Sequence, residues 1–101
     1  MSYEVRWMAG ARRQAAASQR WWVANRQSAP TMLRDELARV IGLLQNNPEL
    51  GIGIKGRQIR RVLLPDTEHL LYYRVRPRAQ RVEIIALWGA AREFGPSLPL
   101  R

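Results

Sequence analysis

Arginine is the residue type in this chain with the most chemical potential, because a guanidinium pairs with phosphate or carboxylate through two parallel hydrogen bonds. The sequence has 17 basic residues against 8 acidic ones, a formal net charge of +9, and Lys55 is its only lysine. Six arginines fall in or beside predicted strands of the second half: Arg60, Arg61, Arg74, Arg76, Arg81 and Arg92. An acidic partner, either a nucleic acid or a protein, is therefore expected, and a solvated basic surface without a partner is the alternative.

Two tyrosines and a histidine lie close to these arginines in the sequence. Neighbouring residues of a strand point to opposite faces, so one of Tyr72 and Tyr73 is expected in the core and the other on the open face or against a partner. Tyr72 would share its face with Arg74 and Arg76, which predicts a basic patch that carries an aromatic ring. A solvated sheet face fits the same alternation. His69 heads this strand, where a solvated side chain is expected more often than a catalytic one.

Several kinds of site are excluded by composition. The chain has no Cys and one His, so it offers no disulfide framework, no thiolate nucleophile and too few nitrogen or sulfur ligands for a zinc site. The glycine-rich stretch from Gly51 to Gly56 is not followed by the Gly-Lys-Ser/Thr triplet of a phosphate-cradling loop. We therefore expect no metal and no cofactor.

Trp21 and Trp22 are adjacent in a segment that has helical composition. Successive helical residues project about 100° apart, so both indoles cannot face one core. One of them is expected at the rim of the helix. An exposed Trp beside an apolar groove is typical of a binding anchor, and a partly buried core Trp is the alternative.

Hydrophobic periodicity predicts the elements that must position these side chains. The predicted elements are a strand over residues 3–8, helices over 9–25 and 33–44, a glycine loop over 49–56, strands over 58–64, 68–76 and 81–88, and an irregular tail over 89–101. Leu33, Leu37, Val40, Ile41 and Leu44 form the clearest amphipathic stripe. The order β-α-α-β-β-β predicts an α+β fold in which an antiparallel sheet is covered on one face by a helical hairpin.

The length of 101 residues predicts a single domain over 1–101 with one modest core. No run of apolar residues is long enough to span a bilayer, and the N-terminus alternates like a strand where a signal peptide would have a long apolar region. We therefore expect a cytoplasmic protein without a membrane partner.

Six short strings carry a resemblance that covers most of the chain. They are EVRW at 4–7, NPELG at 47–51, RVLLP at 61–65, LYYRV at 71–75, VEII at 82–85 and LWGAAR at 87–92. Each string is common by itself, but their order and spacing together resemble the RelE/ParE superfamily, the toxins of bacterial type II toxin–antitoxin systems. The resemblance implies the β-α-α-β-β-β fold, a growth-inhibiting function and a cognate acidic antitoxin.

The superfamily has two branches with different targets. RelE-like toxins cleave mRNA on the ribosome, and ParE-like toxins poison DNA gyrase. Two positions that are basic in the ribonuclease branch fall here near Leu70 and near Ala90 or Ala91. Arg92 is the nearest cation to the second position, but at best it is shifted from that position. The tail has neither Tyr nor His. General acid–base chemistry therefore lacks its residues, and the resemblance favours the ParE-like branch, a binding inhibitor without catalysis.

The resemblance also implies where partners bind. An antitoxin helix would lie in the groove of the helical hairpin, with Trp21, Trp22, Leu33, Leu37 and Ile41 as its contacts, in a toxin–antitoxin hetero-oligomer. Gyrase would meet the basic patch formed by the six arginines named above. Two alternatives stay open: a divergent mRNA endonuclease that acts on the ribosome through Arg60, Arg74, Arg92 and Tyr72, and a non-toxic basic domain that binds nucleic acid.

Overall fold

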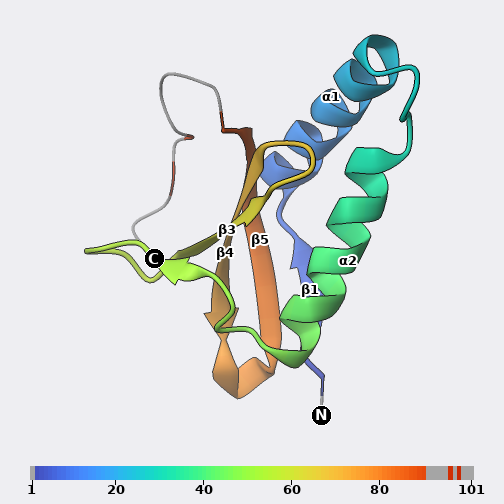
Figure 1. The fold of residues 1–101 in the computed structure, drawn as a ribbon. Coiled ribbons are helices and arrows are strands. Elements are labelled where there is room, and N and C mark those ends of the chain that lie inside the picture. Colours follow the sequence, from blue (N-terminus) through green and yellow to red (C-terminus); the bar gives the residue numbers. More distant parts are fainter. Residues whose placement is uncertain (1, 91–95, 97, 99–101) are drawn as a thin grey trace.

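The computed structural model describes residues 2–90, 96 and 98. Its elements are β1 (Glu4–Trp7), α1 (Ala9–Asn25), α2 (Met32–Asn46), β2 (Ile52–Gly53), β3 (Arg60–Leu64), β4 (His69–Arg76), the short 3-10 helix η1 (Pro77–Ala79) and β5 (Arg81–Gly89). The two helices form a hairpin that lies against one face of the sheet (Figure 1). The α+β fold and the order of the main elements predicted from the sequence are confirmed. Neither helix in this part of the chain is long and apolar enough to cross a membrane.

The sheet has five strands in the order β1-β5-β4-β3-β2. Strands β3, β4 and β5 form the predicted antiparallel meander. The expectation of a wholly antiparallel sheet is wrong, because β1 pairs in parallel with β5, with Val5 opposite Val82 and Trp7 opposite Ile84. β5 would otherwise present its unpaired backbone groups to water, and β1 covers this edge before the chain enters α1.

The glycine loop predicted over residues 49–56 contains a strand. Ile52 and Gly53 form β2, which pairs with Arg61 and Arg60 at the outer edge of β3. A two-residue strand that contains one glycine and follows another is too short to show an alternating pattern, which is why the sequence indicated a loop. β2 matters for the site because it holds the backbone of Gly51 beside β3.

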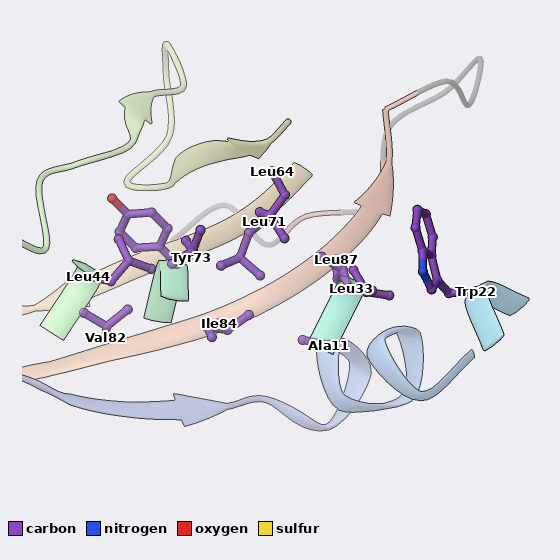
Figure 2. Close-up of a cluster of buried hydrophobic side chains, with 11 residues drawn as sticks. Ala11, Trp22, Leu33, Leu44, Leu64, Leu71, Tyr73, Val82, Ile84 and Leu87 are labelled. Carbon is purple, nitrogen blue, oxygen red and sulfur yellow. The ribbon is translucent and has the colours of Figure 1, made fainter. Parts of the chain in front are cut away.

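The main core lies between the helical hairpin and the sheet (Figure 2). α2 contributes Leu33, Val40 and Leu44 from its predicted apolar stripe, and α1 contributes Ala11 and Trp22. Complete burial of a leucine side chain such as that of Leu33 is worth about 1.5–3 kcal/mol. α1 buries little apolar surface, so its attachment depends strongly on Trp22, whose Nε1 also donates a 2.8 Å hydrogen bond to the carbonyl of Ala29 in the turn between the helices.

The sheet face opposite the helices is also partly apolar. Tyr73 lies in the main core and Tyr72 lies on this second face, as the alternation along β4 predicts. Tyr72 packs there with Ile59 and Ala86, and residues such as Leu98 lie against them. Apolar side chains therefore pack on both faces of the sheet, and not only on the face that the helices cover. Of the tail predicted to be irregular, Gly89 ends β5, and most other positions lie outside the described residues.

Candidate functional site

Three of the predicted patch arginines gather around one carboxylate on the face opposite the helices. The antiparallel register places Arg74 opposite Glu83 and Arg76 opposite Arg81. The Nε atoms of Arg74, Arg76 and Arg81 lie 2.7, 3.2 and 3.0 Å from the carboxylate oxygens of Glu83. We call these four residues the arginine cluster. It carries three positive charges against one negative charge, a local net charge of +2.

Glu83 is almost buried, with 7% of its surface exposed. Burial by itself would raise the pKa of its carboxyl group, but the hydrogen bond and charge of Arg74, together with Arg76 and Arg81, outweigh burial and lower the pKa below its ordinary value. Glu83 is therefore ionised at neutral pH and acts as the fixed counter-ion of the three guanidiniums. A carboxylate held in this way is a poor proton acceptor.

The other predicted patch residues are not brought into the arginine cluster. Arg60 stands opposite Tyr73, so its side chain leaves the sheet on the helix side, and its Nη1 donates a 2.8 Å hydrogen bond to the carbonyl of Gly51. Arg61 stands opposite Tyr72 and is exposed on the same face as the arginine cluster. Arg92 lies outside the described residues. The structure thus divides the five described arginines of the predicted patch between the two faces of the sheet.

The two candidate acid–base side chains near these arginines are enclosed. Tyr72 is only 5% exposed and packs against Ile59 and Ala86. The expectation of a solvated His69 is wrong, because this residue is 8% exposed and lies beside Trp22, with their ring centroids 6.5 Å apart. The Nδ1 atom of His69 is 2.9 Å from the carbonyl of Thr67, and the ring is on the helix side, across the sheet from the arginine cluster.

The inner side of the helical hairpin is filled by the protein's own core. Leu33 is fully buried, and Leu37 and Ile41 pack against the core cluster, half-buried. Trp22 is 6% exposed, whereas Trp21 is 51% exposed at the rim, which confirms that the two indoles separate. Of the five residues predicted to contact an antitoxin, Trp21 therefore offers the largest free side-chain surface.

A groove opens on the other side of α1. It has a volume of about 960 Å³ and lies between α1, the turn that joins β3 to β4, and the end of β5. Trp21, Trp22 and Trp88 contribute aromatic surface, and Arg13 and Arg26 contribute positive charge. The guanidinium of Arg26 lies 5.2 Å from the ring centroid of Trp21 and 5.8 Å from that of Trp22. We call this surface the α1 groove. It combines aromatic and arginine side chains, the types that dominate binding hot spots.

Glu36 fixes one wall of the α1 groove and was not singled out by the sequence. Its carboxylate is 3% exposed and accepts hydrogen bonds from the backbone N–H groups of Asp66 and Thr67, at 2.8 and 3.1 Å, and from the Thr67 hydroxyl at 2.7 Å. Asp66 and Thr67 belong to the turn that lines the groove. The available signal was a carboxylate within the apolar stripe of α2, because a charge at such a position is buried only with partners.

The described residues present two candidate binding surfaces, the arginine cluster and the α1 groove. Among the residues that the structure describes, no group of three or more His, Asp or Glu side chains could hold a metal ion. Tyr72 lies on the same face as the arginine cluster but is only 5% exposed, and His69 lies on the other face of the sheet. What the molecule presents is a cationic sheet face and a separate aromatic groove. These features define a small basic α+β protein whose surfaces are suited to acidic partners.

Comparison with known proteins identifies the family. The family described as "ParE toxin of type II toxin-antitoxin system, parDE" matches residues 5–94. The chain therefore belongs to the ParE toxin family, and the resemblance to the RelE/ParE superfamily is confirmed. No curated protein matches the chain in sequence.

Solved structures agree on the fold. A structure from the chromosomal ParDE system of P. aeruginosa superposes with a TM-score of 0.70 at 15% identity, covering 87% of this chain and 96% of that one. The intact E. coli RelBE toxin–antitoxin complex gives 0.68 at 14% identity, covering 90% and 100%. The RelBE2 toxin–antitoxin complex from Mycobacterium tuberculosis gives 0.60 at 20% identity, covering 88% and 99%. Both branches of the superfamily thus share this architecture.

Proposed function

We propose that this ParE-family toxin arrests bacterial growth by binding DNA gyrase, without a chemical step of its own, and that an acidic antitoxin neutralises it. One observation carries the choice of binding over catalysis: Tyr72, the tyrosine on the same sheet face as the arginine cluster, is buried. Cleavage of RNA through its 2′-hydroxyl needs a proton acceptor within hydrogen-bond reach of the substrate. Gyrase as the target follows from the ParE-like branch of the family.

The α1 groove is the proposed antitoxin site. Its aromatic floor suits the apolar side of an amphipathic helix, and Arg13 and Arg26 suit acidic residues on that helix. The inner side of the hairpin is occupied by Leu33 and its neighbours, so an antitoxin helix binds more readily outside α1, where Trp21 is exposed. The formal net charge of +9 favours fast association with an acidic partner, and apolar burial supplies most of the affinity.

Two assays on the purified chain distinguish the branches. The first measures supercoiling of relaxed plasmid by bacterial DNA gyrase, and we expect the chain to inhibit it. The second maps the 5′ ends of mRNA on programmed ribosomes, and we expect no new ends. Codon-specific cuts together with uninhibited gyrase would reject the proposal in favour of a ribosome-dependent endonuclease. A pre-formed complex with the antitoxin should be inactive in both assays, which checks that inhibition belongs to the free toxin.

A further inference from the structure

The arginine cluster holds more positive charge than its architecture needs. Backbone pairing already joins β4 to β5, and Glu83 nevertheless has Arg74, Arg76 and Arg81 around it. Like charges at such short separations repel one another, and partial burial strengthens this repulsion because protein screens charge less than water does. The side chains of Arg74, Arg76 and Arg81 are 18%, 37% and 28% exposed. An external anion on this face would pair with the guanidiniums of Arg76 and Arg81, which share Glu83 with Arg74.

The hydrogen bonds of the cluster leave binding groups available. Glu83 is contacted by the Nε atom of each arginine, so this contact does not need the terminal nitrogens of Arg76 and Arg81. Within the described part of the chain, Arg76 and Arg81 donate their side-chain hydrogen bonds from Nε and not from a terminal nitrogen. Two such nitrogens on one guanidinium match two oxygens of a phosphate. Glu83 thereby sets the orientation of the donors without using them all.

The surroundings indicate which polyanion fits. Tyr72, the aromatic residue next to Arg74 on this face, is buried and presents no ring on which an unpaired base could stack. Proteins that bind single strands rely on such stacking, whereas duplex DNA is held mainly through its backbone phosphates. Arg61 is exposed on the same face and adds a further cation at the neighbouring strand. We infer that the arginine cluster is a binding site for the phosphate backbone of duplex DNA.

DNA binding by this site can be tested separately from the proposed action on gyrase, although the sequence places gyrase at the same arginines. A chain that binds DNA through the cluster but leaves gyrase active would keep this inference and reject the proposed function. A chain that inhibits gyrase but does not bind DNA by itself would keep the proposed function and reject this inference. The two experiments use different components, so their failures can be told apart.

The test measures binding of the full chain to a fluorescently labelled duplex of mixed sequence over a series of salt concentrations. The logarithm of the association constant should fall linearly with the logarithm of salt concentration, by about 0.9 for each phosphate neutralised. Arg76→Gln and Arg81→Gln should each weaken binding and reduce this slope by about one. Arg20→Gln is the matched control, because Arg20 is exposed on α1, across the sheet from Glu83, and its loss changes the net charge equally.

Glu83→Gln separates an organised site from simple attraction. The substitution adds one net positive charge, so unspecific attraction alone predicts tighter binding of DNA. If Glu83 positions the guanidiniums, binding should weaken in spite of the added charge. Circular dichroism and the melting midpoint check the fold of this variant, and the two arginine variants test the site whether or not Glu83→Gln folds.

Three results would overturn the inference. The first is equal loss of affinity in Arg20→Gln and in the two cluster variants, which would mean that only net charge matters. The second is preferential binding of poly-glutamate over duplex DNA at equal charge concentration, which would assign the site to carboxylates. The third is the absence of measurable DNA binding at low salt.

Discussion

The hydroxyl of Tyr73 is in direct contact with the backbone of Gly51, with no room for a side chain at position 51. The N–H group of Gly51 donates to the Tyr73 hydroxyl at 2.7 Å, and this hydroxyl donates to the carbonyl of Pro48 at 2.8 Å. Burial raises the pKa of the Tyr73 phenol above its ordinary value, in spite of the opposing hydrogen bond from Gly51. The phenol therefore keeps its proton at neutral pH. Its two hydrogen bonds hold the segment after α2 against β4, the central strand of the sheet.

Gly51→Ala should destabilise the protein by about 1–3 kcal/mol, the usual range for forcing extra volume into a packed interior. A Cβ at this position would lie 2.7 Å from the carbonyl oxygen of Arg61 and 2.8 Å from the Tyr73 hydroxyl. Gly53→Ala is the control, because a Cβ there would meet nothing within 4 Å. Urea unfolding of both variants measures the difference, and equal stabilities would contradict the fit described here.

Acid should weaken the protein partly through Glu83. Its pKa is lowered in the folded state, so its contribution to stability is present above the ordinary value of 4.5 and is lost as pH falls through the lowered value. In unfolding curves below about pH 4.5, Glu83→Gln should therefore depend less on pH than the wild type. Glu4→Gln serves as the control, because the ion pair of Glu4 with Arg6 is exposed. An unchanged pH profile in Glu83→Gln would show that the carboxylate is not held as the geometry indicates.

Glu36→Gln should cost about 1–3 kcal/mol although it preserves the shape of the side chain. Both carboxylate oxygens of Glu36 accept hydrogen bonds, so an amide group would place a donor against the N–H of Asp66 or Thr67. Asp35→Asn on the same helix is exposed and should change stability by less than about 0.5 kcal/mol. Thermal unfolding compares the two variants. Because Asp66 and Thr67 line the α1 groove, Glu36→Gln should also weaken antitoxin binding.

Trp21→Ala should accelerate dissociation of the antitoxin and cost about 2 kcal/mol or more of binding free energy. Val23→Ala is the control, because Val23 is 45% exposed on the same helix but does not line the α1 groove. Raised salt should slow association and leave dissociation almost unchanged, since long-range attraction acts on the encounter. Surface plasmon resonance separates the two rates. If Trp21→Ala leaves dissociation unaffected while salt abolishes the complex, the antitoxin binds the basic sheet face.

The sequence predicts best those features that depend on local periodicity. The apolar stripe from Leu33 to Leu44 indicated α2, and alternation along β4 placed Tyr72 and Tyr73 on opposite faces, as the structure has them. Pairing between distant segments leaves no such period. The parallel contact of β1 with β5 and the two-residue strand β2 could therefore not be predicted.

The site was predicted less completely than the fold, for the same reason. Alternation shows which residues of one strand share a face, but it does not give the register of the next strand. Arg60 was therefore grouped with Arg74, although the register of β3 places Arg60 opposite Tyr73 on the helix side. The role of Glu83 depends on three partners from two strands, and the burial of His69 depends on Trp22 in α1. These contacts exist only after the elements have packed.

The central claim is that this toxin acts by occupying its target, and a titration of gyrase tests it most directly. Supercoiling activity is measured over time at toxin concentrations below, equal to and above that of gyrase. Occupancy predicts that inhibition at substoichiometric toxin reaches a constant partial level in proportion to the toxin added and becomes complete only when all gyrase is bound. Progressive loss of all gyrase activity at substoichiometric toxin would show turnover and contradict the account.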